Sequence, residues 1–211
     1  SLGYSAGSYY IPWEETEIFF KHYCEEQSKG NDVYLTEKHK NISPILIDLD
    51  FRYDKASSEV RRIYSKKHLK DFLSKYMTEL KKYVVFDQDQ KIYILEKPAP
   101  RFDEQKSIIK DGVHMWISNV VTSPTVQYKI RELVLEHMEE IFQDCSFVNK
   151  PADIFDENVI EKNNWLMYGS RKITDQTRYL VTDILTYTKD EELISADSIP
   201  DIPVLVRDLS I

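Results

Sequence analysis

The chain has 211 residues and a mass of 25.0 kDa, and 42% of its residues are hydrophobic against 30% charged. This length can bury a substantial core, as one α/β domain or two interlocked lobes, and the composition excludes a low-complexity chain. A net charge of −8 argues against a protein that coats nucleic acid indiscriminately, because such binding depends on many neutralised phosphates. No apolar run approaches the roughly 18 residues of a membrane helix, so we expect neither a membrane span nor secretion.

Three further features concern the whole chain. The two cysteines, Cys24 and Cys145, lie far apart and lack metal-ligand spacing, which favours reduced core thiols. The chain starts at Ser1 rather than Met, so we expect a piece of a longer protein. Residues 61–110 carry 13 Lys and Arg against 7 acids, whereas residues 132–161 carry 9 acids and the single Lys150. A basic edge of this kind suits weak, local binding of a nucleic-acid strand, or equally a solvated helix face.

The predicted elements begin with a helix from Trp13 to about Gln27, with Ile18, Phe19, Phe20 and Tyr23 as its buried stripe. A short strand over residues 32–36 and an apolar strand over residues 45–51 come next. Between Lys66 and Val85, apolar side chains recur every three or four residues, which predicts a long amphipathic helix.

The second half continues the alternation of strands and helices. Residues 91–96 and 112–121 are predicted strands, separated by a loop that contains prolines. Ser123 and Pro124 have the residue types of a helix start, and the apolar spacing predicts a helix through Phe142. Residues 147–163 are polar and irregular, and residues 165–168 and 178–188 are apolar, strand-like segments. We therefore expect an α/β (α+β) fold, a mixed β-sheet flanked by helices.

The strand over residues 45–51 carries two acids, Asp48 and Asp50, two positions apart. Side chains alternate across a strand, so both carboxylates point to one face, together with Arg52, while the opposite face is apolar. Two like charges beside a core are costly unless cations neutralise them. Mg²⁺ and Mn²⁺ prefer carboxylate oxygens, so the pair predicts a divalent-metal site for phosphoryl or nucleotidyl transfer. The alternative is a strand that ends at the surface with two solvated acids.

Two later segments add candidate site residues. His114 lies behind Gly112 on a predicted strand, where it is able to donate to a phosphate oxygen or to serve as a hydrogen-bonded core histidine. The segment Trp165 to Lys172 ends in Gly-Ser-Arg-Lys, a turn with a hydroxyl and two cations that suits a triphosphate or, equally, an ordinary surface turn. Upstream lie further acids, namely Asp153, Asp156 and Glu157.

The order and spacing of the D-L-D strand, the G-V-H strand and the N-N-W-L-M-Y-G-S-R-K segment resemble the archaeo-eukaryotic primase superfamily. Within it, the chain resembles the primase domain of the primase-helicases of nucleocytoplasmic large DNA viruses, the poxvirus and mimivirus type. The W-L-M-Y-G-S-R-K stretch is the most distinctive motif. The resemblance implies that residues 1–211 form one primase catalytic domain, a primase-like core with an RRM-like unit.

The resemblance also implies roles for individual residues. Asp48 and Asp50 would bind the catalytic metals, Mg²⁺ or Mn²⁺, with Asp156 as the third ligand and Asp153 in reserve. His114 would contact the phosphates of the incoming nucleotide, and Ser170 and Lys172 match the segment that faces the nucleotide. Arg52 and Arg171 are added from their position and charge.

The implied activity is template-directed synthesis of primers on single-stranded DNA from nucleoside triphosphates, at a viral replication site in the host cytoplasm or nucleus. A superfamily-three helicase usually comes after such a domain in the same polypeptide, and this chain contains no Gly-x-x-x-x-Gly-Lys loop of its own. Two alternatives remain open. One is a metal-dependent nuclease, and the other is a non-catalytic module that binds DNA or recruits a helicase.

Overall fold

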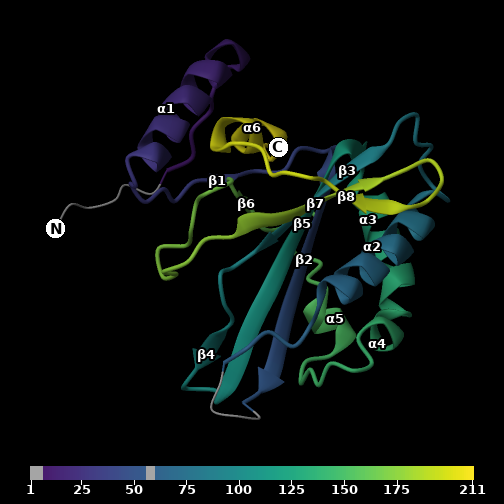
Figure 1. The fold of residues 1–211 in the computed structure, drawn as a ribbon. Helices are drawn as coiled ribbons and strands as arrows, with labels where there is room; N and C mark the ends of the chain where they lie inside the picture. Colours follow the sequence, from purple (N-terminus) through teal and green to yellow (C-terminus); the bar gives the residue numbers. More distant parts are fainter. Residues whose placement is uncertain (1–6, 56–59) are drawn as a thin grey trace.

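The computed structural model describes residues 7–55 and 60–211, which fold into β-sheet and flanking helices (Figure 1). Its helical elements are η1 (Trp13–Glu15), α1 (Thr16–Ser28), α2 (Lys66–Leu80), α3 (Pro124–Leu135), α4 (Met138–Ile141), α5 (Pro151–Ile154) and α6 (Ile202–Asp208). Its strands are β1 (Thr36–Glu37), β2 (Ser43–Asp54), β3 (Gln90–Glu96), β4 (Arg101–Asp103), β5 (Ile108–Thr122), β6 (Trp165–Leu166), β7 (Leu180–Tyr187) and β8 (Leu193–Ser195).

The main sheet has the strand order β2-β5-β3-β7-β8, and β4 pairs with one end of β5. A second, two-stranded sheet joins β1 to β6. The predicted fold class, an α/β sheet flanked by helices, is confirmed. The main sheet was expected to be mixed, but every strand pairing in the described residues is antiparallel.

Two apolar cores lie on the two faces of the main sheet. Ile45, Ile47 and Leu49 of β2 belong to the core that also contains the buried faces of α2 and α3. Leu46 belongs to the other core, together with apolar residues of α1, β6 and α6. The alternation predicted for this strand is therefore confirmed, because neighbouring β2 residues enter different cores. The acids Asp48 and Asp50 share the face of Leu46.

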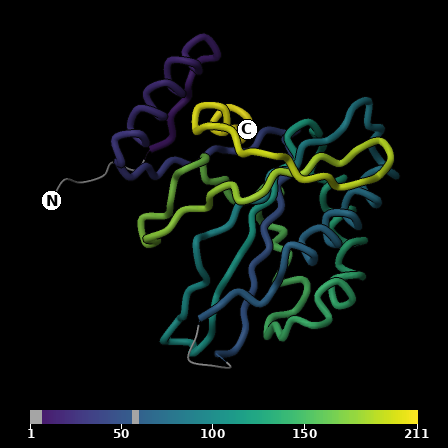
Figure 2. Tube along the Cα trace, viewed as in Figure 1, coloured from purple at the N-terminus to yellow at the C-terminus, as the bar shows by residue number. Residues whose placement is uncertain are grey.

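Helices from opposite ends of the chain meet on the second face. Figure 2 shows α1 and α6 side by side, and an ion pair of 2.8 Å joins Glu17 of α1 to Arg207 of α6. Helices α1 and α6 thus cover one part of the sheet together.

Several predicted boundaries were wrong. The helix expected to reach Val85 ends at Leu80, and the next residues form single turns in which Tyr83 N–H donates to Leu80. The helix expected to continue to Phe142 breaks after Leu135, because the His137 N–H turns back to Val134, three residues earlier. After the break, α4 returns Met138 and Phe142 to the core. Ile18, expected to be buried on α1, is exposed.

Both cysteines are free, as predicted, and Cys24 is buried whereas Cys145 is half-buried. Within the described residues, no helix has the length and apolar character needed to cross a membrane.

Candidate active site

The two acids of β2 are brought opposite the glycine and histidine of β5. In the antiparallel register, Asp48 is the partner of His114 and Asp50 is the partner of Gly112. Both pairs lie inside the uninterrupted run of pairing from Ile45 to Asp54, away from the register shift between Pro44 and Ile45, so the backbone beneath the site is well supported. The structure therefore brings together three residues that the sequence predicted for one site.

Asp48 is held in an environment that opposes its negative charge. Its side chain is 16% exposed, yet its Oδ1 atom is enclosed and has no hydrogen-bond partner among the described residues. Burial raises the pKa of Asp48 well above its usual value, and the nearby charges of Asp50 and Asp156 raise it further. Burial also raises the pKa of Asp50. A buried, unpaired carboxylate oxygen beside two more acids is a site that favours a cation.

His114 is enclosed by aromatic rings. Its ring stacks on Tyr179 with centroids 3.6 Å apart and planes 16° apart, and it lies 4.4 Å from the ring of Trp165. Burial lowers the pKa of His114 to about 3, and the positive charges of Lys172 and Lys97 contribute. The imidazole is therefore neutral at physiological pH. Its Nε2 atom lies 3.7 Å from Asp48 Oδ1, beyond hydrogen-bond distance.

Gly112 leaves room for the tyrosine that holds His114. A Cβ atom at this position would lie 2.7 Å from the hydroxyl oxygen of Tyr179 and 3.2 Å from the Leu49 carbonyl oxygen. No larger side chain fits there without displacing Tyr179. The glycine is thus needed for a close side-chain approach, and the same imaginary Cβ lies 3.5 Å from an oxygen of Asp50.

The third acid, Asp156, comes after α5 and is joined directly to β2. Its backbone N–H donates to the Asp48 carbonyl at 3.0 Å, and its Oδ1 accepts from the backbone and side-chain nitrogens of Asn158 at 3.0 and 2.6 Å. The charge of Asp156 acts on both Asp48 and Asp50, whereas that of Asp153 is not among the charges that shift either pKa. The placement of Asp156 agrees better with the expected third ligand.

The three carboxylates do not converge tightly in this structure. Across residues 7–55 and 60–211, one group of three His, Cys, Asp or Glu residues has ligand atoms all within 4.8 Å of one another, and it consists of His68, Asp144 and Cys145. A shared cation at Asp48, Asp50 and Asp156 therefore requires side-chain rotation, and Asp156 Oδ1 is engaged with Asn158 in this structure.

The group around His68 is better explained as a helix cap than as a metal site. The Ser65 backbone N–H donates to His68 Nδ1 at 3.0 Å, so this nitrogen carries a lone pair and no proton. The proton of the neutral ring must then lie on Nε2, which is 2.7 Å from Asp144 Oδ1 and donates to it. Neither ring nitrogen has a lone pair left for a metal. The arrangement closes a capping box at the start of α2.

The predicted cationic residues have different surroundings. Lys172 is exposed, and its positive charge lowers the pKa of Asp48. Arg52 is exposed, and its charge lowers the pKa of Asp50.

Arg171 is half-buried and donates from Nε to Asp32 at 2.9 Å and from Nη2 to the Tyr34 hydroxyl at 3.0 Å.

Ser170 is buried rather than open to solvent. Its hydroxyl lies 2.8 Å from the Tyr23 hydroxyl and accepts from the Leu35 N–H at 3.0 Å. These contacts tie the Gly-Ser-Arg-Lys turn to α1 and to the segment before β1. A contact of Ser170 or Arg171 with a nucleotide remains a prediction.

Two functional candidates were missed in the sequence. Lys97 comes directly after the last residue of β3, and its ammonium group lies 2.7 Å from Asp175 and 5.0 Å from the Tyr179 ring centroid. Tyr179 itself precedes β7. The signal available for Lys97 was its place between a buried strand and Pro98, and nothing local marked Tyr179 as a partner of His114.

The donor set fits a hard divalent cation. The acids supply carboxylate oxygens, one of which is buried without a partner among the described residues, and positive side chains lie nearby to receive an anion. The antiparallel sheet with flanking helices, and the acid pair of edge strand β2 opposite a histidine of β5, agree with the primase-like class of domain that the motifs indicated.

The chain belongs to the archaeo-eukaryotic primase (AEP) family. The family model described as "C962R protein N-terminal AEP domain" matches residues 1–185. The chain is similar to "Putative helicase L207/L206" of Acanthamoeba polyphaga mimivirus, with 31% identity over 188 residues, which is 88% of this chain and 19% of that protein. It is also similar to "Putative helicase 184R" of Invertebrate iridescent virus 6, with 24% identity over 92% of this chain and 22% of that protein. The chain thus spans about a fifth of the length of these relatives.

Proposed function

We propose that this chain is the catalytic domain of a DNA primase or primase-polymerase, which joins nucleotides on a single-stranded DNA template during viral DNA replication. The observation that carries the proposal is the register of β2 and β5, which sets Asp48 and Asp50 opposite His114 and Gly112. Membership of the primase family supports the same reaction class.

Asp48, Asp50 and Asp156 would hold the divalent metal, Mg²⁺ or Mn²⁺. When bound, the metal would lower the pKa of the attacking 3′-hydroxyl and neutralise charge on the leaving pyrophosphate. The buried oxygen of Asp48 is the donor that gains most from a cation, because it has no other partner among the described residues. Without a cation, burial and like charge disfavour the charged forms of Asp48 and Asp50.

His114 would donate one hydrogen bond to a phosphate oxygen. Since its ring is neutral, it would orient the phosphate through a hydrogen bond and add no positive charge. Stacking on Tyr179 fixes the plane of the ring.

Positive charge for the triphosphate would come from Lys172, with Arg52, Arg171 and Ser170 as the further predicted contacts. The chain's part in the reaction is therefore positioning and electrostatic stabilisation.

The proposed partners are single-stranded DNA, nucleoside triphosphates and a helicase region of the same polypeptide. The relatives are named as helicases and are about five times longer than this chain, which supports a helicase beyond the matched region. We place the working site of the protein at the viral replication site in the host cell.

The test is primer synthesis on single-stranded DNA with labelled nucleotides and Mn²⁺ or Mg²⁺. We expect product from the wild-type chain, none from Asp48→Ala/Asp50→Ala, and wild-type product from the control Asp54→Ala at the exposed end of the same strand. Equal product from the wild type and the double variant would refute the site. Strand cleavage without added nucleotides would indicate a nuclease, and DNA binding with neither reaction would indicate a non-catalytic module.

A further inference from the structure

We propose that Lys97 binds the polyphosphate of the nucleotide, and that Asp175 is a built-in counter-ion that occupies the Lys97 ammonium group until a polyphosphate displaces it. This inference rests on the proposed function and adds two residues that neither the motifs nor the family match assigns. It names a polyphosphate chain as the ligand of this part of the site.

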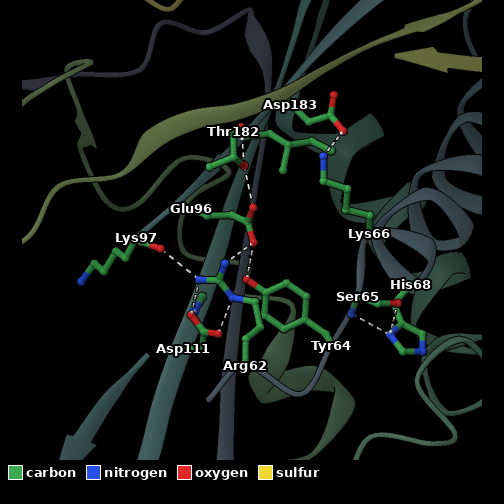
Figure 3. Close-up of polar contacts among 12 residues, drawn as sticks. Arg62, Tyr64, Ser65, Lys66, His68, Glu96, Lys97, Asp111, Thr182 and Asp183 are labelled. Carbon is green, nitrogen blue, oxygen red and sulfur yellow. Dashed lines mark hydrogen bonds and ion pairs between the residues drawn. The ribbon is translucent and has the colours of Figure 1, made fainter. Parts of the chain in front are cut away.

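The backbone of Lys97 is anchored by a buried polar network behind the site. Arg62 donates to the Lys97 carbonyl at 3.0 Å, to Asp111 at 2.8 Å and to Glu96 at 2.8 Å. Tyr64 donates to the same Glu96 at 2.8 Å. Figure 3 shows this network, with the side chain of Lys97 extending away from it. The main chain at Lys97 is therefore fixed, while its side chain remains free to exchange partners.

The ammonium group of Lys97 lies beside the candidate catalytic residues. It is 5.0 Å from the centre of the Tyr179 ring, the ring that stacks on His114 at 3.6 Å. The strand that ends before Lys97 is also paired with β5, with Leu95 as the partner of His114. The charge of Lys97 consequently reaches Asp48 and Asp50. A cation at this position can contact an anion bound near the metal-binding acids.

The carboxylate of Asp175 forms an ion pair with the Lys97 ammonium group. Its Oδ2 atom lies 2.7 Å from Lys97 Nζ, and the side chains of Asp175 and Lys97 are 19% and 23% exposed. The Asp175 backbone N–H donates to the Lys172 carbonyl at 2.9 Å, which closes a turn that carries both Lys172 and the carboxylate. Carboxylate and phosphate oxygens accept the same charge-assisted hydrogen bonds from an ammonium group. Asp175 thus stands where a phosphate oxygen could replace it.

A counter-ion that must be displaced competes with the ligand. Removing the charge of Asp175 should therefore tighten polyphosphate binding, whereas removing the charge of Lys97 should weaken it. The effect of Asp175 should also vanish once Lys97 is gone. The alternative is that Asp175 only holds the Lys97 side chain in position. In that case, removing the charge of Asp175 would let the Lys97 side chain move away, and polyphosphate binding would weaken.

The experiment measures the affinity of the chain for inorganic tripolyphosphate and for a nucleoside triphosphate with Mn²⁺, by calorimetry. We expect Lys97→Met to weaken both by about tenfold, the worth of one charge-assisted hydrogen bond. Asp175→Asn should tighten both severalfold, and the change should be absent in Lys97→Met/Asp175→Asn. Matched controls are Lys91→Met, at the other end of β3, and Asp103→Asn, whose ion pair with Lys110 is also 2.7 Å long.

Weaker or unchanged binding by Asp175→Asn would overturn the counter-ion role. Wild-type affinity in Lys97→Met would overturn the whole inference, and Lys97→Arg, which keeps the charge, should retain binding. Circular dichroism of each variant would show whether it is folded. If the wild-type chain binds no nucleotide with Mn²⁺, the proposed function fails together with this inference. If the wild-type chain and Lys97→Met bind the nucleotide equally well, this inference fails while the proposed function stands.

Discussion

Asp48 shows a conflict between stability and function at a single residue. Two other acids lie near its carboxylate, and one carboxylate oxygen, Oδ1, is enclosed and lacks a hydrogen-bond partner among the described residues. Such a group destabilises the metal-free fold when it is charged. An acid at position 48 is expected where a bound cation offsets this cost.

We predict that Asp48→Asn stabilises the metal-free chain at neutral pH, because the amide carries no charge for burial and the neighbouring acids to oppose. Because burial raises the folded-state pKa of Asp48 above 3.8, the folded state holds its proton after the unfolded state has released it. The free energy of unfolding should then fall as pH rises above this value. Urea denaturation with a chelator, from acid to neutral pH, measures the effect.

The control for this prediction is Asp153→Asn, an exposed acid on α5. It should leave both stability and its pH dependence unchanged. A fall in the stability of Asp48→Asn at neutral pH, or an unchanged pH slope, would show that Asp48 is already well compensated in the folded protein.

At the residue scale, local patterns in the sequence predicted the acid pair and the histidine but missed the contacts between distant segments. Alternation along β2 was enough to place Asp48 and Asp50 together, and the G-V-H motif brought in His114. Lys97 and Asp175 are far apart in the sequence, and their ion pair exists only because β3 and the turn after Lys172 meet. No local pattern reveals such a pair.

At the scale of elements, a buried ionic network joins the segment before α2 to β3 and β5. The Arg62 side chain is 25% exposed, while the carboxylates of Asp111 and Glu96 that it neutralises are 1% and 10% exposed. Glu96 also accepts from Thr182 of β7 at 2.6 Å. Arg62 thus links three neighbouring strands behind the site.

We predict that Arg62→Met destabilises the chain by about 3–5 kcal/mol, because it leaves two buried carboxylates without a cation. Chemical denaturation measures the change. Arg61→Met, at the exposed neighbouring position, should stay within about 0.5 kcal/mol of the wild type. A loss for Arg62→Met as small as that for Arg61→Met would mean that the network contributes little.

The accuracy of the predicted elements differed between their cores and their ends. The core of α2 was predictable because its apolar spacing is regular. On its exposed face, several lysines are paired with acids, such as Lys67 with Asp71 at 2.5 Å. That pairing favours the interpretation of this part of the basic segment as a solvated helix face. The ends of helices were not predictable, since the single turns after Leu80 and Leu135 depend on backbone bonds rather than on Gly or Pro.

At the scale of the molecule, a half-buried glutamate joins the small sheet to the C-terminal segment of the chain. Glu37 of β1 accepts from Ser210 Oγ and from the Ile211 N–H, and its Oε2 atom is enclosed with no partner among the described residues. Burial raises the pKa of Glu37 to about 7. The protonation state of Glu37 therefore bears on the hydrogen bonds that hold Ser210 and Ile211.

We predict that Glu37 makes the fold less stable as pH rises from about 4.5 to about 7, by about 3 kcal/mol. Stability falls in this range because the folded state binds this proton more tightly than the unfolded state does. The measurement is the difference in unfolding free energy between the wild type and Glu37→Gln across this range. Glu104→Gln, at an exposed loop position, is the control. A difference that does not vary with pH would refute the raised pKa.

The overall architecture was predictable to the level of an α/β sheet with flanking helices, because strand and helix periodicities alternate along the chain. The pairing of β1 with β6, and the contact of α1 with α6, join segments more than a hundred residues apart and have no local signature. The approach of the third acid is likewise a property of the whole molecule. Asp156 reaches Asp48 through one backbone hydrogen bond, while its carboxylate is still held by Asn158.

The proposed activity depends above all on the acids of β2 holding the catalytic metal. The most decisive experiment is a crystal structure of the chain with a nucleoside triphosphate and Mn²⁺, with the ions located by anomalous scattering. We predict that Mn²⁺ is bound by the carboxylates of Asp48, Asp50 and Asp156 next to the polyphosphate, with Asp156 released from Asn158. Mn²⁺ bound elsewhere, or a nucleotide bound away from Asp48 and Asp50, would contradict the proposed site.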